Sequence, residues 1–276
     1  MPPTPPRTAS VNGISISYED AGQGPLVVMV MGTGSPGRVW KAHQHPSLVR
    51  AGYRVVTFDN RGIAPSSECA EGFTLDDMVA DTAALIEHVD AGPAAVVGTS
   101  LGARITQELA LARPDVVRCA AMIATCGRNT PDQEAILAGD REMANKRIVL
   151  PEAYHAAITA HLNLAPHTLV DDAAARDWLD IIEFSGQQRT PGIRAQLQLH
   201  AGEADRLQAY RGITRPAMVI GFADDRTLPP HLAREVAEAI PTAEYHEVER
   251  AGHYGYLERP NEVNRLLVDF LGRAIA

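Results

Sequence analysis

The first half of the chain alternates short apolar runs with segments that favour helices, and this alternation restricts the fold more than any other feature. An unbroken apolar run indicates a strand buried on both faces of a sheet. Regular alternation of such strands with helices is typical of a mostly parallel sheet with helices on both faces. We therefore predict an α/β fold. The apolar runs are residues 26–31, 53–58, 94–97 and 117–124, and the helical segments are residues 74–89 and 100–112.

The alternation stops after residue 128 and resumes near residue 214. Segments 151–163 and 171–184 have the apolar periodicity of amphipathic helices. Strand-like runs return at 217–221 and 245–248, before a last helix at 260–271. We therefore expect a core of residues 1–128 and 214–276, interrupted by a helical lid of residues 129–213 that covers the edge of the sheet.

A candidate nucleophile lies where one strand turns into a helix, in Gly98-Thr99-Ser100-Leu101-Gly102. A sharp strand-to-helix turn would strain the backbone of Ser100 and project its hydroxyl beyond the end of the strand. Glycines are needed at both flanks because side chains there would collide with the strand and the helix. The alternative is an ordinary turn in which Ser100 caps the helix. We predict that Ser100 is a nucleophile.

A base and an acid for Ser100 follow the last two strands of the predicted sheet. His253 lies between the last strand and the last helix, so we expect it at the same end of the sheet as Ser100, as a general base. Two adjacent aspartates, Asp224 and Asp225, follow the preceding strand and could orient His253. We favour Asp225, which precedes Pro229 by four residues. Asp132, in the loop that follows the strand ending at Ala124, is the less favoured alternative.

These residues, in the order Ser, Asp, His, resemble the α/β-hydrolase superfamily, and within it bacterial esterases and cofactor-free haloperoxidases. The resemblance covers nearly the whole chain outside the lid. It implies catalysis through a serine hydroxyl, with no metal and no organic cofactor. The motifs that carry it are Gly98–Gly102, Asp59-Asn60-Arg61-Gly62, Asp225–Pro229, and Gly252-His253 followed by Leu257–Pro260.

The oxyanion loop departs from the family pattern. Relatives carry His-Gly after the third strand, whereas this chain has Met31-Gly32-Thr33-Gly34. By position, the backbone N–H groups of Leu101 and Thr33 are expected to stabilise an oxyanion. A phosphate-binding loop is the alternative for this glycine-rich segment, but the Lys-Ser/Thr ending of a P-loop is absent from the sequence.

The substrate contacts are the least constrained part of the sequence. We expect a small, apolar substrate bound near the oxyanion loop and under aromatic side chains of the lid. For those aromatic residues and Trp40, packing inside the protein is the alternative. Segments 31–40 and 57–63 resemble actinobacterial members found near polyketide or peptide pathways, which implies a tailoring or chain-releasing role. The expected contacts are Gly32, Gly34, Trp40, Tyr154, Trp178 and Tyr254, with Phe184 as a further wall residue.

Three functions remain open from the sequence. The first is hydrolysis of an ester, thioester or lactone through an acyl-serine, with peroxide-dependent chemistry as a side reaction. The second uses the same triad for elimination, cyclisation or carbon–carbon cleavage. The third is a binding protein without catalysis. An intact set of Ser100, His253 and Asp225 favours the first two.

Composition excludes several other classes of function. The formal net charge of −9 argues against nucleic-acid and anionic-membrane partners. Three cysteines without metal-ligand spacing indicate neither a disulfide framework nor a zinc site, and they fit a reducing compartment. The proline-rich start lacks a signal-peptide pattern, and no apolar run reaches the roughly 18 residues of a membrane span. We expect a cytoplasmic monomer or homodimer.

Overall fold

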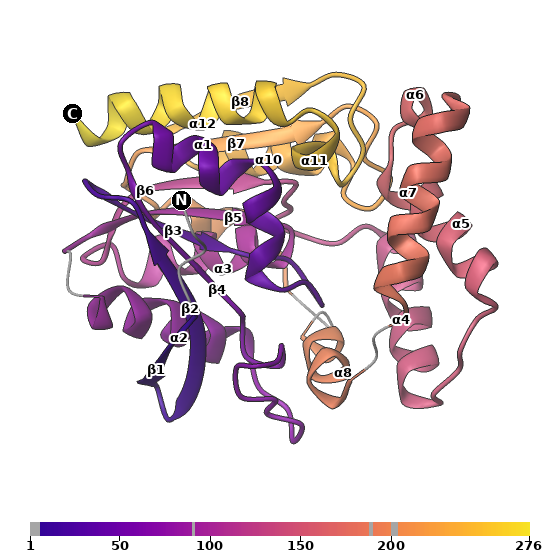
Figure 1. Cartoon of the computed structure of the whole chain (residues 1–276). Helices are drawn as coiled ribbons and strands as arrows, with labels where there is room; N and C mark the ends of the chain where they lie inside the picture. Colours follow the sequence, from indigo (N-terminus) through magenta and orange to yellow (C-terminus); the bar gives the residue numbers. More distant parts are fainter. Residues whose placement is uncertain (1–5, 90–91, 188–189, 200–203) are drawn as a thin grey trace.

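A mostly parallel sheet of eight strands forms the centre of the protein, in the order β1-β2-β4-β3-β5-β6-β7-β8 (Figure 1). The computed structural model describes residues 6–89, 92–187, 190–199 and 204–276. β2 runs antiparallel to both of its neighbours, and the remaining pairs are parallel. The predicted α/β fold is confirmed. The strands are β1 Arg7–Val11, β2 Ile14–Ala21, β3 Leu26–Val30, β4 Arg54–Phe58, β5 Ala94–Thr99, β6 Val117–Ile123, β7 Ala217–Phe222 and β8 Ala243–Val248.

The antiparallel edge begins with a tight hairpin between β1 and β2. Asn12 and Gly13 both have positive φ angles, of 47° and 75°. A two-residue hairpin turn whose residues both have positive φ matches the right-handed twist of the strands, and Asn-Gly is its preferred sequence. The turn fixes the register, in which Val11 faces Ile14.

Helices cover both faces of the sheet because the buried strands present apolar side chains to both. In β3, Val28 and Val30 belong to one core cluster and Val27 and Met29 to the other, as the two-residue period of a strand requires. Helices α2, α3 and α10 pack on the first face, and η1, α1 and α12 on the second. Their bounds are α2 Leu75–His88, α3 Leu101–Ala112, α10 Pro230–Ala239, η1 Gly37–Ala42, α1 Gln44–Arg50 and α12 Pro260–Ile275.

The helix predicted after residue 73 is confirmed together with its cap. Thr74 precedes α2, and its side chain accepts the N–H of Asp77 while the Asp77 carboxylate accepts the N–H of Thr74. This reciprocal capping box satisfies two backbone donors at the start of the helix. Asp76 and Asp77 place negative charge in the first turn, where the helix dipole favours it.

The segment between β6 and β7 contains helices, and no strand appears among its described residues. We call α4 to α8 the cap helices. α4 to α7 stand together at one end of the sheet, and α8 packs against α4 on the side nearer to the core (Figure 1). A small apolar cluster of Ala156, Ala160, Leu164 and Ile182 joins α5 to α7. The cap helices are α4 Pro131–Asn145, α5 Glu152–Asn163, α6 Pro166–Leu169, α7 Asp172–Ser185 and α8 Pro191–Gln198, followed by α9 Leu207–Tyr210.

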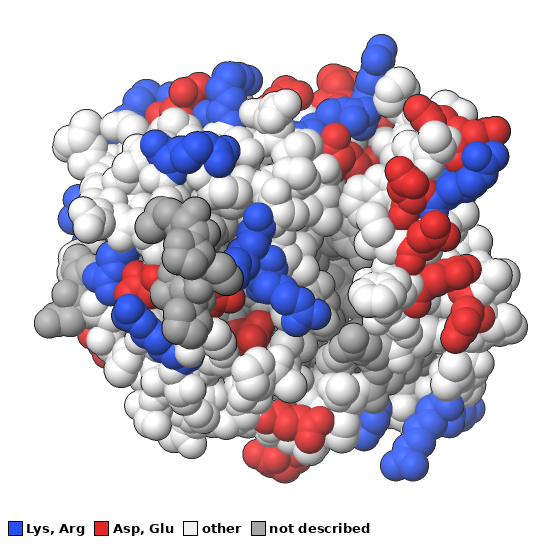
Figure 2. Space-filling view, viewed as in Figure 1, with Lys and Arg blue, Asp and Glu red and all other residues white. Residues whose placement is uncertain are grey.

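Charge is unevenly spread over the visible face of the molecule. Figure 2 shows acidic side chains gathered over α7, which carries exposed Asp172, Asp177, Asp180 and Glu183. Within the described residues, none of the helices combines the length and the apolar character needed to cross a membrane. Residues 1–5 of the proline-rich start lie outside the described residues.

Candidate active site

Ser100 lies in a strained turn between β5 and α3. Its backbone angles are φ 54° and ψ −121°, a combination that costs energy for any residue with a side chain. A Cβ on Gly98 would lie 2.1 Å from the carbonyl oxygen of Gly102, and one on Gly102 would lie 2.2 Å from that of Val30. Both glycines are therefore required by close backbone packing. The surrounding structure holds Ser100 in this conformation, as the sequence predicts for an exposed nucleophile.

The oxyanion loop, residues 31–35, packs directly on Ser100. A Cβ on Gly32 would lie 3.2 Å from the Cβ of Ser100, a tight contact that would require these atoms to move apart by a few tenths of an ångström. Leu101 is the first residue of α3, and first-turn N–H groups have no acceptor within their own helix. Leu101 and Thr33 both line the same cavity as Ser100. The structure thus brings together the two residues expected to donate backbone N–H groups.

His253 and Asp225 form a buried pair at the same end of the sheet. Nδ1 of His253 lies 2.8 Å from Oδ2 of Asp225, whose side chain is fully buried. The other carboxylate oxygen of Asp225 accepts the N–H of Leu228 at 2.7 Å. This second hydrogen bond fixes the orientation of the carboxylate. Because Nδ1 is engaged, Nε2 is the ring nitrogen left for chemistry in the cavity.

The other two aspartates that the sequence offers are placed differently. The N–H of Asp224 donates to the carbonyl of Ala251, which holds the backbone of the acid loop against the loop of His253. Asp132 lies in the first turn of α4 and accepts a hydrogen bond from Thr130. Of the three candidates, Asp225 is the one that the structure brings to His253.

Ser100 and His253 open into a mostly apolar cavity of about 360 Å³. Its floor is the sheet end with the oxyanion loop, and its walls come from α4, α5 and α8. A largely apolar pocket with a few polar groups is typical of small-molecule sites. The apolar and aromatic side chains in its lining are Met31, Leu101, Ile136, Leu137, Met143, Leu150, Ile158, Leu162, Leu197, Leu228, Tyr254 and Tyr256.

The loop of His253 is tied to the cap helices by Glu258. One carboxylate oxygen accepts the N–H of Gly252 at 2.7 Å, and the other accepts the N–H of Ala165, before α6, at 3.0 Å. The N–H of Tyr254 also donates to the carbonyl of Asn163, the last residue of α5, at 2.9 Å. Glu258 belongs to the sequence motif Leu257–Pro260, which gives no sign of this role. Its role depends on contacts with a segment about 90 residues away in the chain.

Two of the expected substrate contacts near the core lie outside the cavity. Trp40 is fully buried, and its ring packs on Tyr256 with 5.2 Å between ring centroids. Gly34 is turned toward α8, where its N–H is bound by Gln196. Gly32 and Tyr254, in contrast, line the cavity. The packing alternative applies to Trp40, because it belongs to the apolar cluster on the second face of the sheet.

The aromatic side chains expected to form the lid wall are also absent from the cavity lining. Tyr154 is 56% exposed on α5 and Phe184 is 95% exposed on α7. Trp178 stacks on Tyr254, with ring centroids 6.3 Å apart, and so contacts the cavity only through that residue. The inner face of α7 is occupied by Ile182 and Trp178, which turns Phe184 outward.

A buried arginine and a buried cysteine near Ser100 were missed by sequence analysis. Arg104 lies one helical turn after Ser100, lines the cavity and hydrogen-bonds with the Cys126 thiol. Burial raises the pKa of Cys126, and Arg104 only partly offsets this effect. A neutral thiol is a weak nucleophile. Cys126 is therefore a poor competitor of Ser100.

Metal-ligating side chains are dispersed in the part of the chain that the structure describes. No group of three or more His, Cys, Asp or Glu residues is placed there to hold a metal ion. His253, which lines the cavity, is bound to the buried Asp225.

Comparison with known proteins places the chain in one family. A family model described as the alpha/beta hydrolase fold matches residues 25–260. The chain is 45% identical over 257 residues to "Putative non-heme bromoperoxidase BpoC" of Mycobacterium tuberculosis strain H37Rv, covering 93% of this chain and 97% of that protein. The crystal structure of that protein matches with a TM-score of 0.91 at 44% identity, over 95% of this chain and 97% of that one.

A more distant solved structure has the same architecture. The enol-lactonase from Burkholderia xenovorans LB400 matches with a TM-score of 0.82 at 25% identity, over 96% of this chain and all of that one. The chain therefore belongs to the α/β-hydrolase fold family, as its motifs predict. It is an enzyme of the α/β-hydrolase class, among relatives that are named hydrolases, esterases and haloperoxidases.

Proposed function

We propose that this protein is a serine hydrolase that cleaves an ester, thioester or lactone through Ser100, His253 and Asp225. The observation that carries the proposal is the buried His253–Asp225 pair, 2.8 Å apart, whose His253 lines the same cavity as the strained Ser100. A nucleophile, a base and a group that orients the base are the parts that acyl transfer requires. The oxyanion donors in this proposal are the N–H groups of Leu101 and Thr33.

The first half-reaction acylates Ser100. Nε2 of His253 takes the hydroxyl proton as Oγ bonds to the carbonyl carbon, and the carbonyl π electrons move onto the oxygen. The buried Asp225 carboxylate stabilises the imidazolium that forms. The tetrahedral intermediate then expels the alcohol, thiol or ring oxygen, which takes the proton from His253. Each oxyanion donor contributes roughly 3–4 kcal/mol to the stability of the transition state.

The second half-reaction returns the enzyme to its starting state. His253 takes a proton from water, and the resulting hydroxide bonds to the acyl carbon. Collapse of the second tetrahedral intermediate releases the carboxylic acid, and Ser100 Oγ recovers its proton from His253. All groups that this cycle needs are side chains and amides of the chain itself.

The lining of the cavity supports an apolar acyl group of modest size as the substrate. The walls from α4, α5 and α8 are mainly aliphatic, and the volume of about 360 Å³ suits a small molecule. A polyketide-type or peptide-type natural product is our more specific proposal. Its support is the resemblance of segments 31–40 and 57–63 to pathway members.

Peroxide-dependent chemistry is a second candidate, because the relative with 45% identity is named a non-heme bromoperoxidase. In this reaction hydrogen peroxide replaces water in the second half-reaction. It bonds to the acyl carbon through one oxygen and releases a peracid and free Ser100. The peracid would then oxidise bromide in solution. The two candidates share the acyl-serine and differ only in the molecule that resolves it.

The test compares the native enzyme with Ser100→Ala on a p-nitrophenyl ester in ¹⁸O-labelled water. We expect Ser100→Ala to lower kcat by about 10³-fold or more. We also expect one labelled oxygen in the acid that the native enzyme releases. Activity of Ser100→Ala above a few per cent of native would contradict the covalent scheme. An acid released without labelled oxygen would show that water does not resolve the acyl-serine, which contradicts the second half-reaction.

A further inference from the structure

We infer that Gln196, in cap helix α8, is a positioning residue that holds the oxyanion loop in its active geometry. This inference rests on the function proposed above, since it concerns the N–H group that Thr33 donates. Gln196 is fully buried and comes from a segment about 160 residues beyond the oxyanion loop. It does not line the cavity and so acts through the loop, without touching the substrate.

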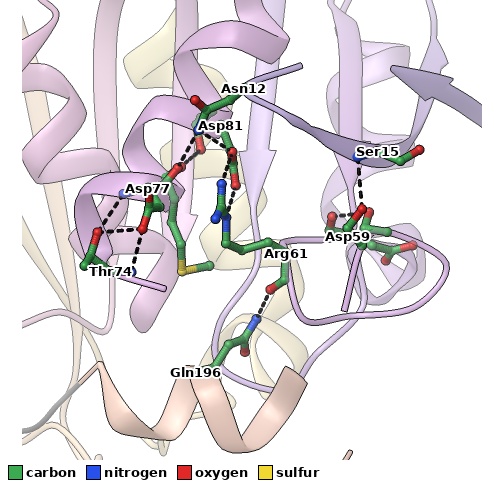
Figure 3. A network of polar contacts seen from close by, with 12 residues as sticks. Asn12, Ser15, Asp59, Arg61, Thr74, Asp77, Asp81 and Gln196 are labelled. Carbon is green, nitrogen blue, oxygen red and sulfur yellow. Dashed lines mark hydrogen bonds and ion pairs between the residues drawn. The ribbon is translucent and has the colours of Figure 1, made fainter. Parts of the chain in front are cut away.

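The amide of Gln196 bridges two backbone segments of the core. Its Oε1 accepts the N–H of Gly34 at 2.8 Å. Its Nε2 donates to the carbonyl of Arg61 at 2.8 Å (Figure 3). Both ends of the amide are therefore used on main-chain groups. A buried amide with one donor and one acceptor bond in place is costly to replace with an apolar side chain, because two backbone groups would lose their partners.

Hydrogen bonds hold the oxyanion loop on both sides of the Gly32–Thr33 peptide group. Asn60 Nδ2 donates to the carbonyl of Met31 at 2.9 Å, which fixes the peptide group before Gly32. Gln196 binds the N–H of Gly34, which fixes the peptide group after Thr33. The Gly32–Thr33 peptide group, which carries the Thr33 N–H, thus lies between two fixed neighbours. This arrangement points to control of the direction of that N–H.

The turn at Asn60–Gly62 is itself a rigid support. Arg61 makes a buried, bidentate ion pair with Asp81 of α2, with N–O distances of 2.5 and 2.6 Å. Asn12 adds a hydrogen bond to Asp81 from the β1–β2 hairpin at 2.8 Å (Figure 3). A planar guanidinium bound through two nitrogens has a fixed orientation. The carbonyl of Arg61 therefore presents a fixed anchor to Gln196.

The docking of α8 on this turn is equally close. A Cβ on Gly192 would lie 2.2 Å from the carbonyl oxygen of Gly62, so glycine is required at that contact. Gly192 and Gln196 are four residues apart and share one helix face. The contact at Gly192 allows α8 to pack closely on the turn at Asn60–Gly62, and this close packing brings the Gln196 amide within hydrogen-bond distance of the core. α8 is thus fixed to the core, although it belongs to the segment expected to form a lid.

This arrangement also explains how the chain tolerates Met31 where relatives carry histidine. A histidine in the oxyanion loop supplies hydrogen bonds that methionine cannot make. Here Asn60 and Gln196 supply bonds to the loop from outside. Without Gln196, the Gly34 N–H and the Arg61 carbonyl would have to find other partners, and the loop would relax. A shift of about 1 Å in a catalytic group can lower the rate by about 100-fold.

The experiment measures kcat, KM and the affinity of a trifluoromethyl ketone in Gln196→Met. The ketone forms a tetrahedral adduct with Ser100 and places an oxyanion in the hole. We expect kcat to fall by about 10- to 100-fold with KM within about threefold. The inhibition constant of the ketone should rise by the same factor as kcat falls. A purely structural role would not link these two quantities.

Gln187→Met is the matched control. Gln187 makes the same kind of double clamp within the cap, accepting the N–H of Leu150 at 3.0 Å and donating to its carbonyl at 2.6 Å. We expect kcat and ketone affinity within about twofold of native in this variant. Equal losses in both variants would overturn the inference, since general loosening of the cap would then explain them.

Gln196→Asn serves as a second variant if Gln196→Met does not fold. It keeps the amide but is one methylene too short to reach both Gly34 and Arg61, so we expect the same losses. Native kcat and ketone affinity in either folded variant would overturn the inference. That outcome is distinct from failure of the proposed function, in which Ser100→Ala itself would remain active.

Discussion

Asp225 and Asp224 are neighbours in the chain, but the structure gives them different surroundings. The carboxylate of Asp225 is enclosed and bonds to both His253 and the Leu228 N–H. Asp224 is half-buried, and its backbone N–H holds the acid loop to Ala251. The role of each aspartate therefore depends on the surroundings that its side chain reaches from the acid loop. A shift of one position along the chain changes those surroundings.

The first prediction concerns this pair. Asp225→Asn should lower kcat by about 10³- to 10⁴-fold, because an amide can stabilise the wrong tautomer of His253 and cannot stabilise its imidazolium. Asp224→Asn should stay within about threefold of native. Steady-state kinetics on a p-nitrophenyl ester, with circular dichroism to verify folding, measures both. The reverse order of effects would make Asp224 the triad acid.

Local patterns in the sequence were sufficient to select the three residues that the proposed mechanism uses. Ser100 is marked by flanking glycines, His253 by its place after the last strand, and Asp225 by its distance from Pro229. Gln196 and Glu258 have no such marks, because their roles arise from partners roughly 90 to 160 residues away. These hydrogen bonds form only because α8 and α6 pack against the core of the protein. No local pattern in the sequence indicates how these helices pack.

At the scale of elements, two helices of the segment between β6 and β7 were predicted from the sequence, but the neighbours of their side chains were not. The helices expected at 151–163 and 171–184 are α5 and α7 in the structure. The prediction that their aromatic residues face the substrate failed for Tyr154 and Phe184, which are exposed. Periodicity identifies an apolar face but does not say which neighbour covers it. The cap covers the site mainly with aliphatic side chains instead.

The second prediction concerns the junction between β5 and α3. Gly98→Ala should destabilise the protein by about 3 kcal/mol or more, because its Cβ would lie 2.1 Å from the Gly102 carbonyl oxygen. Gly139, in the middle of α4, has no atom within 4 Å of a new Cβ. Gly139→Ala should therefore stabilise the protein by about 0.5–1 kcal/mol.

Urea unfolding followed by circular dichroism compares these two alanine variants directly. Both exchanges add one methyl group, so the difference between them reports the packing of the site. Equal effects on the free energy of unfolding would show that the β5–α3 junction can relax. In that case Ser100 would not depend on its flanking glycines for its strained backbone.

At the scale of the whole molecule, the cap is fastened to the core at both sides of the candidate active site. α8 is bound to the oxyanion loop through Gln196, and the end of α5 is bound to the loop of His253 through Tyr254. The walls of the cavity between these two fastenings come from α4 and α5. The segment between β6 and β7 therefore both shapes the cavity and braces the loops beneath it.

One acidic residue of the antiparallel edge adds ion pairs to the backbone pairing between β2 and β4. Asp20, in β2, makes a bidentate ion pair with Arg54 of β4, at 2.8 and 2.9 Å, and also contacts Arg7 of β1 at 3.2 Å. The Asp20 side chain is only 8% exposed. Hydrogen bonding to Arg54 holds the pKa of Asp20 below its ordinary value, against the opposing effect of burial.

The last prediction follows from the sign of that shift. A carboxyl whose pKa is lower in the folded state contributes stability above its unfolded pKa of about 3.9, and this contribution is lost as the pH falls through the folded pKa. The free energy of unfolding should therefore decline below about pH 4. In Asp20→Asn it should be about 1–3 kcal/mol lower than native at pH 7. The difference from native should shrink as the pH falls below 4.

Asp115→Asn is the control, because Asp115 also has a lowered pKa, through its hydrogen bond with Arg113, but lies fully exposed. Solvent and salt screen an exposed pair, so its loss should leave the unfolding curve close to native at 0.15 M salt. Equilibrium unfolding in urea from pH 3 to pH 8 measures all three proteins. If Asp20→Asn and Asp115→Asn behave alike, burial does not strengthen the Asp20 pair. The antiparallel edge would then be held by its backbone pairing and apolar contacts alone.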